Sequence, residues 1–299
     1  MFYGRILDKK TEAEDIVAFM KTYILLNPLA GHYMNGYRAH KLSDRLGVPP
    51  EDCKDVTKIN YKSFFDSLEP QDSVIICGGD GTLARFAMFA KNNVIKNDVF
   101  YCATGEVNDF IRDLDLEEQD DLIKVNHYVK NLPIATVNGK EYALLNGIGM
   151  GVDASARARE LEMRSKNVKN IKHGSIVAGL LLLRMKPSVA TITIDGVTGT
   201  FKNVWCAQTL VGRYSAGLMS APKQKRVGDG KLTLFLMRGI GRFKALMVYN
   251  LALRGEHVKH KDMCKLLRGK DITVSFDKPT NIQINGEVIE GVREYRVRV

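Results

Sequence analysis

The first half of the chain alternates between short apolar runs and segments with a helical period. The apolar runs at 23–26, 73–77 and 99–103 read as buried strands, and helical patterns cover 11–20, 37–46 and 82–91. Strands separated by helices indicate a parallel sheet, and such sheets bind ligands beyond the carboxyl ends of their strands. We therefore predict an α/β domain over residues 1–130.

The second half has mostly strand patterns, interrupted by helical stretches at about 154–186 and 241–254. Asn138-Gly139 and Asp195-Gly196 each separate two strand patterns and predict tight hairpin turns. We predict a β-rich domain with inserted helices over 131–290. The sequence leaves open whether a last strand within 291–299 returns to the first domain. Further strand patterns lie at 232–237, 272–276 and 281–285.

All three predicted strands of the first half end in loops of small and polar residues, at 27–31, 78–82 and 104–109. The second loop, Gly78-Gly79-Asp80-Gly81-Thr82, lies directly between a strand and a helix. Glycine lets backbone approach an anion closely, and N–H groups at a helix N-terminus attract phosphate. The three loops together favour a nucleotide site over an ordinary strand–helix turn.

Composition is typical of a folded protein, with 45% hydrophobic and 26% charged residues among 299. The five cysteines show no CxxC spacing, which fits a reducing compartment and predicts no zinc site. The longest strongly apolar stretch, 175–183, is shorter than the roughly 20 residues of a membrane span. No signal-peptide pattern is visible in the first residues, so we expect a cytoplasmic protein.

The net charge of +10 is concentrated in two segments, 157–172 and 254–270. Neither segment is interleaved with aromatic residues and no nucleic-acid motif is present, so we expect no nucleic-acid partner. Both segments are interpreted as solvated helix faces, and both also suit transient contact with an anionic membrane surface. The β-rich half leaves a homodimer possible.

Several motifs, in this order and spacing, resemble the diacylglycerol kinase-type lipid kinases. That family includes bacterial phospholipid kinases and sphingosine kinases, and its catalytic domain shares a fold with NAD kinases. The resemblance covers nearly the whole chain. It implies an NAD kinase-like three-layer α/β domain followed by a β-sandwich-like domain, with the active cleft between them. The motifs are Asn27-Pro28 with Gly31, 78–82, 104–105 with 108–110, 146–154, 221–222 with 228–232, and 285–287.

The resemblance implies ATP and Mg²⁺ as cofactors and the transfer of the γ-phosphoryl group to a lipid hydroxyl, most simply that of diacylglycerol. It assigns catalysis to Asp80, Asn285 and Glu287, and a structural Mg²⁺ to Asp229 with the carbonyls of Arg226 and Lys231. Asp109 is expected near the Mg²⁺ that accompanies ATP. The nucleotide-binding residues would be Asn27, Gly31, Gly78, Gly79, Gly81, Thr82, Thr104, Gly105 and Asn108.

The sequence departs from the family pattern at two places. Asn285 stands where the family has the aspartate that accepts the hydroxyl proton, and a neutral amide cannot act as that base. Either Glu287 or Asp80 takes the role, or Asn285 deamidates, or catalysis is lost. Glu106-Val107 replaces a hydroxyl residue and a glycine in the third loop, which places like charge near phosphate.

Three functions therefore remain open. The first is the lipid kinase. The second is an NAD kinase, because that class shares the Gly-Gly-Asp-Gly-Thr motif. The third is a family member that binds nucleotide or lipid without transferring phosphate, which the two departures favour.

Overall fold

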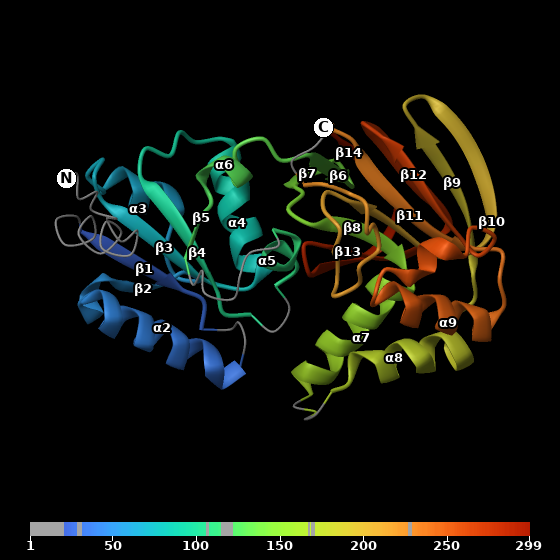
Figure 1. Cartoon of the computed structure of the whole chain (residues 1–299), viewed down its shortest axis with the longest axis horizontal. Helices are drawn as coiled ribbons and strands as arrows, with labels where there is room; N and C mark the ends of the chain where they lie inside the picture. Colours follow the sequence, from blue (N-terminus) through green and yellow to red (C-terminus); the bar gives the residue numbers. More distant parts are fainter. Residues whose placement is uncertain are drawn as a thin grey trace, which may run out of the picture. The chain divides into compact units, whose positions relative to one another are not determined.

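The chain folds into two compact units in a computed structural model that describes residues 21–28, 32–105, 108–114, 122–166, 168, 171–226 and 229–299 (Figure 1). The first unit comprises Met1–Glu106 and Glu117–Lys130, and the second comprises Val107–Leu116 and Asn131–Val299. The sequence places residues 107–116 in the first domain, whereas the structure assigns them to the second unit. The predicted helix at 11–20 lies outside the described residues.

The first unit contains a five-stranded sheet in the order β2-β1-β3-β4-β5. The first four strands in this order are parallel, and β5 runs antiparallel to β4. Val74 and Ile76 are fully buried and Ile75 nearly so, as expected for a strand covered on both faces. The strands are β1 (Thr22–Leu26), β2 (Cys53–Asp55), β3 (Ser73–Gly78), β4 (Asp98–Ala103) and β5 (Ile123–Lys124).

Helices cover both faces of this sheet, which gives three layers (Figure 1). Ala39 and Leu42 of α2 pack against Ile24, Ile75 and Cys77 on one face. On the other side, aromatic residues join α3 to α4, with the rings of Tyr61 and Phe89 stacked at 5.4 Å. The helices are α2 (His32–Leu46), η1 (Pro50–Asp52), α3 (Tyr61–Asp66), α4 (Asp80–Lys91) and α6 (Asn126–Val129).

The second unit is built on a nine-stranded antiparallel sheet in the order β12-β11-β10-β8-β13-β14-β6-β7. The remaining strand, β9, pairs with both β10 and β13, which β8 also joins, so four strands form a closed ring. The strands are β6 (Ile134–Val137), β7 (Lys140–Ala143), β8 (Gly147–Gly151), β9 (Ser188–Ile194), β10 (Val197–Leu210), β11 (Leu232–Arg238), β12 (Cys264–Gly269), β13 (Asp271–Ile284) and β14 (Glu287–Arg298).

Three hairpins in this unit turn on an Asx-Gly pair with positive φ at both residues. Asn138-Gly139 and Asp195-Gly196 are the predicted turns, and Asn285-Gly286 is the third. Left-handed conformations at both central positions match the twist of the flanking strands. β14 follows the third turn and pairs with β13 and β6, so the last strand belongs to the second unit and does not return to the first.

Helices of the second unit include the predicted stretches. The pattern at 154–186 forms α7 (Val152–Ser165), α8 (His173–Gly179) and a π-helical continuation, η2 (Leu180–Arg184), and that at 241–254 forms α9 (Arg242–Ala252). Within the described ranges, no helix has both the length and the apolar character needed to cross a bilayer. Two shorter helices are α5 (Asp109–Asp113) and η3 (Glu256–Lys259).

Candidate functional site

The predicted phosphate loop joins the carboxyl end of β3 to the first turn of α4. Gly79 is the N-cap residue in extended conformation, with φ −95° and ψ −176°, and Asp80 is the first helical residue. The N-terminus of this 12-residue helix carries the positive end of the helix dipole. The N–H of Thr82 already donates to the carbonyl of Gly79, at 2.9 Å. This arrangement can bind a phosphate oxygen.

The carbonyl of Gly78 holds the third loop against the second. It accepts hydrogen bonds from the backbone N–H groups of Thr104 and Gly105, at 2.9 and 3.2 Å, and from the Tyr101 hydroxyl at 3.0 Å. The N–H groups of Thr104 and Gly105 are therefore used to fix the loop and do not point at a ligand. Their predicted contact with nucleotide would come from other atoms.

The first loop is tied to the second by a side-chain hydrogen bond. Nδ2 of Asn27 donates to Oγ1 of Thr82 over 2.8 Å. A Cβ on Gly78 would lie 2.4 Å from that same oxygen, whereas a Cβ on Gly79 would meet only the Cα of Gly105, at 3.5 Å. Gly78 is thus required to make room for Thr82. The structure brings Asn27, Gly78, Thr82, Thr104 and Gly105 together.

The chemistry of this cluster fits a nucleotide phosphate. Oγ1 of Thr104 is buried and has no hydrogen-bond partner among the described residues. A buried hydroxyl without a partner is costly unless a ligand supplies one. The predicted nucleotide-binding residue Gly31 lies outside the described residues, as do Glu106 and Val107, at which the third loop departs from the family pattern.

Asn108 and Asp109 belong to the second unit, where Asp109 starts α5. Asp109 is buried, accepts a 2.9 Å hydrogen bond from the N–H of Gly217, and forms an ion pair with Arg112 at 3.2 Å. Burial raises the pKa of the Asp109 carboxyl, although Gly217 and Arg112 oppose that shift. In this arrangement Asp109 anchors its helix within the second unit.

Arg226 also anchors α5. Its guanidinium donates to Asp113 Oδ2 and to Asn146 Oδ1, both over 2.8 Å, and to the carbonyl of Leu145. Asp113 accepts a further hydrogen bond from Nε of Arg213 at 3.1 Å. These contacts join residues 107–116 to the second unit.

The predicted Mg²⁺ ligands are partly engaged within the protein. Asp229 Oδ1 accepts from Arg268 Nη2 at 2.9 Å, and the carbonyl of Lys231 accepts from Gln224 Nε2 at 2.7 Å. A carboxylate with carbonyl oxygens is the hard donor set that Mg²⁺ prefers, so the residue types fit the ion. A metal there would compete with Arg268 for Asp229. In the part of the chain that the structure describes, no three His, Cys, Asp or Glu side chains gather as metal ligands.

Asn285 has a structural role at the β13–β14 turn. Its Oδ1 accepts from the N–H groups of Leu145 and Asn146, at 2.9 and 3.3 Å, while its Nδ2 donates to the carbonyl of Ala143 at 2.8 Å. Both ends of the amide are needed, which explains asparagine at this position. Glu287, two residues later, is exposed at the start of β14.

Asp153 was missed by sequence reasoning. The residue is 1% exposed, and neither carboxyl oxygen has a hydrogen-bond partner among the described residues. Burial raises the pKa of the Asp153 carboxyl to about 6, and the nearby charge of Asp109 adds to the shift. The Gln208 amide lies close enough to favour the ionised form, although no well-aligned hydrogen bond joins the two side chains. An acid two residues after the glycine-rich strand 147–151 was the available signal.

Known proteins share this sequence pattern and fold. Diacylglycerol kinases of Staphylococcus carnosus and Bacillus subtilis are each 22% identical to the chain; the alignments cover 73% and 74% of it, and 71% and 73% of those proteins. The crystal structure of a diacylglycerol kinase from Bacillus anthracis superposes with a TM-score of 0.63 at 21% identity, over 93% of each chain.

The second unit carries the family signature. Residues 146–297, just over half of the chain, match the family described as the YegS C-terminal NAD kinase β-sandwich-like domain. This confirms the expected β-sandwich-like domain and its relation to the NAD kinase fold. The chain belongs to the diacylglycerol kinase-like family whose members carry this C-terminal domain.

Proposed function

We propose that this protein is an ATP- and Mg²⁺-dependent lipid kinase that transfers the γ-phosphoryl group to a lipid hydroxyl, most simply that of diacylglycerol. The observation that carries the proposal is the cluster of three loops in the first unit. There the N-terminus of α4, the Asn27–Thr82 hydrogen bond and the unpartnered Thr104 hydroxyl lie together. The diacylglycerol kinases among the relatives give the acceptor class.

The residues present support binding and proton transfer. The positive end of the α4 dipole and the Thr104 hydroxyl would bind phosphate oxygens. Asp229, with the carbonyls of Arg226 and Lys231, would hold a structural Mg²⁺, and Asp80 would lie beside a second Mg²⁺ that accompanies ATP. The ion, when bound, neutralises charge that develops on the phosphoryl group. Asn285 cannot accept the hydroxyl proton, because it is an amide and both of its ends are bonded to backbone. Asp80 and Glu287 are the carboxylates proposed for that role.

One observation favours a non-catalytic alternative. The residue in the family's base position here stabilises a hairpin turn. A protein that kept the loops but lost the base would bind nucleotide or lipid without transferring phosphate.

A transfer assay tests these functions. The purified protein is incubated with labelled ATP, Mg²⁺ and a panel of neutral lipids, or with NAD in place of lipid. Label on lipid supports the kinase proposal, label on NAD indicates an NAD kinase, and binding without transfer indicates the alternative. We expect Asp80→Ala to lower kcat/KM by about 100-fold or more, in the range of lost electrostatic groups.

Asp66→Ala is the matched control. Asp66 lies in the same unit and forms an exposed ion pair with Lys62, and such pairs contribute little. Transfer by this variant should stay within about twofold of the original, on the scale of a lost surface pair. If the Asp80 variant is as active as this control, the assigned site is wrong.

A further inference from the structure

One segment of the second unit combines exposed apolar side chains with an excess of positive charge. From Met163 to Ile194 the sequence has no aspartate or glutamate, yet it contains four lysines and two arginines. The described part of this segment includes the end of α7, all of α8 and η2, and β9. A cationic segment without acids is typical of a surface that meets anionic lipid.

The continuous helix formed by α8 and η2 exposes one leucine on a solvent side that also carries Ser175 and Arg184. Val177 and Leu181 are fully buried in the core, whereas Leu183 is 80% exposed. A surface helix normally turns polar residues to solvent, and the exposed Leu183 departs from that pattern. Leu183 is the last of four consecutive leucines, 180–183, in the π-helical turn η2.

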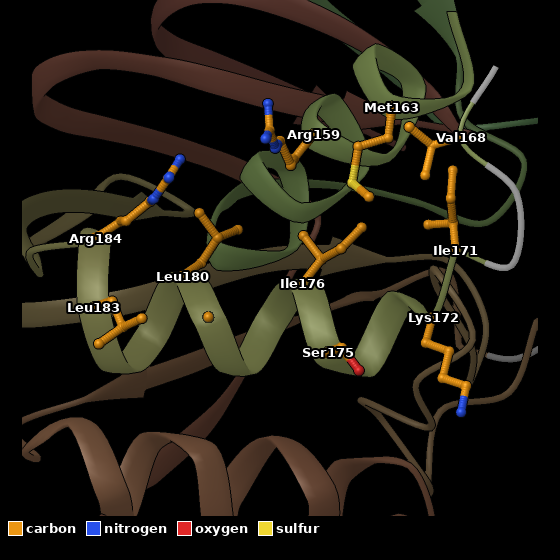
Figure 2. A pocket seen from close by; sticks show the side chains of 11 residues that line it. Arg159, Met163, Val168, Ile171, Lys172, Ser175, Ile176, Leu180, Leu183 and Arg184 are labelled. Atoms are coloured by element: carbon orange, nitrogen blue, oxygen red, sulfur yellow. The ribbon is translucent and has the colours of Figure 1, made fainter. Parts of the chain in front are cut away.

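A hollow of about 420 Å³ lies beside this helix, between α7 and α8 (Figure 2). Met163, Ile176 and Leu180 point into it, and Arg159 and Arg184 lie along one edge. Lys172 lies at the other end of α8. The hollow is therefore apolar inside and cationic at its margin.

The cations at this margin are available to a partner. No carboxylate of the described residues lies within 4.0 Å of the charged groups of Lys172 and Arg184, which line the hollow, or of Lys186, two residues beyond Arg184. Arg159, in contrast, pairs with Glu162. Lys172, Arg184 and Lys186 are all exposed. Unpaired cations around an exposed leucine complement a surface that is anionic outside and apolar beneath.

We infer that the α7–α8 face docks on an anionic bilayer, with Leu183 entering the boundary between headgroups and acyl chains and Lys172 and Arg184 contacting lipid phosphates. Charge complementarity selects this occupant, because a second copy of the chain would bring two cationic margins together. The inference goes beyond the proposed kinase activity, since docking requires neither nucleotide nor phosphate transfer.

Flotation with vesicles tests the inference. The protein is mixed, without nucleotide, with vesicles of phosphatidylcholine alone or of phosphatidylcholine with an equal part of phosphatidylglycerol. We expect binding to the anionic vesicles only, and weaker binding as salt is raised above about 0.1 M. Leu183→Asp should lower the partition coefficient about tenfold, the effect of one lost apolar anchor.

Two matched controls separate this face from the rest of the surface. Val197→Asp changes an equally isolated apolar residue, 77% exposed, at the start of β10. Lys172→Gln with Arg184→Gln should weaken binding roughly 30-fold, at about 1 kcal/mol per basic residue. Lys278→Gln, which changes an exposed lysine of β13, should leave binding unchanged. Thermal unfolding of each variant checks that the fold is retained.

Three results would overturn the inference. One is undiminished vesicle binding by Leu183→Asp, and another is an equal loss with Val197→Asp. The third is sedimentation showing that Leu183→Asp separates a dimer, which would make this face a contact between copies. The kinase proposal and the docking face can fail separately. Vesicle binding without phosphate transfer contradicts only the kinase proposal. Transfer to detergent-dispersed diacylglycerol without vesicle binding contradicts only the docking face.

Discussion

Asn285 occupies a position of the family motif and a turn position at once. Its φ of +49° and the following Gly286 form the same two-residue turn as Asn138-Gly139. The sequence alone supports a catalytic interpretation of position 285, because the flanking motif matches the family. The turn at this position was not predicted, although an Asn-Gly pair at the end of the strand pattern 281–285 was an available signal.

Asn285→Asp therefore tests two opposing effects. The carboxylate restores the family's base, which predicts faster transfer. It also loses the donor to the Ala143 carbonyl and places negative charge beside it, so we expect the free energy of unfolding to fall by about 1–3 kcal/mol. Urea unfolding measures the loss of stability, and the transfer assay measures the gain in transfer rate. Asn138→Asp is the control, since Asn138 occupies the same turn position but is exposed; equal losses in both variants would contradict the structural role of Asn285.

Asp153 gives the second unit a pH-dependent stability. Its folded-state pKa of about 6 lies above the value of about 3.9 for an unfolded chain. Between these two values the folded state holds more protons, so the free energy of unfolding falls as pH rises from about 4 to about 6. Above about pH 6 the free energy of unfolding stays lower by the full amount, on the order of 3 kcal/mol.

Asp153→Asn removes this titration. The measured quantity is the free energy of unfolding of the variant minus that of the original protein, from urea unfolding with a chelator present. We expect this difference to be more favourable to the variant at pH 8 than at pH 4. Asp262→Asn, an exposed aspartate of the same unit, should show the same difference at both pH values. Parallel pH profiles for the Asp153 variant and the original protein would count against a raised pKa.

At the scale of elements, α5 belongs to the second unit because of its contacts, although residues on both sides of it in sequence belong to the first unit. Asp113 pairs with Arg226, 113 residues further on, and both side chains are nearly buried, at 1% and 5% exposure. No local pattern reveals such a distant partner, so sequence analysis assigned residues 107–116 to the preceding domain. The ion pair corrects that boundary.

Arg226→Met should destabilise the protein by about 3–5 kcal/mol, because it leaves a buried carboxylate with one fewer cation. Arg226→Met combined with Asp113→Asn should recover part of this loss in urea unfolding. Arg268→Met is the matched control: it breaks an exposed pair with Asp229, at 48% and 50% exposure, and should cost less than about 1 kcal/mol. Equal losses from both arginine substitutions would show that Arg226 does not hold α5.

Whether the bounds of a helix or strand could be predicted also depends on whether they are set by local sequence or by distant contacts. The uniform apolar runs of β1, β3 and β4 and the hairpins at Asn138-Gly139 and Asp195-Gly196 were predicted because their signal is local. β13 was interpreted as two strands, at 272–276 and 281–285, because Lys278-Pro279 interrupts the pattern. The structure continues one strand, Asp271–Ile284, through a pairing irregularity between Ser275 and Thr280, where proline is tolerated. β2, with three residues, has too little pattern to predict.

At the scale of the whole molecule, the sequence predicted two differently built halves and the structure has them, a mostly parallel sheet in the first unit and an antiparallel one in the second. The resemblance supplied the family, which the comparisons confirm. Which loop atoms remain available for a ligand could not be predicted, since this depends on hydrogen bonds such as those of Gly78. The proposed nucleotide contacts therefore need a test that resolves the two units.

Hydrogen exchange with ATP and Mg²⁺ provides that test. A ligand that binds only the folded state stabilises it by about 2.7 kcal/mol at 100 times its Kd. If the loops of the first unit bind ATP, exchange should slow in peptides that cover Gly78–Thr82 and residues 101–105, and the β9–β10 hairpin of the second unit should serve as an unaffected reference. Asp80→Ala should abolish the slowing if Asp80 holds the metal that accompanies ATP. Protection confined to the second unit, or none at saturating nucleotide, would contradict the phosphate site and with it the proposed kinase.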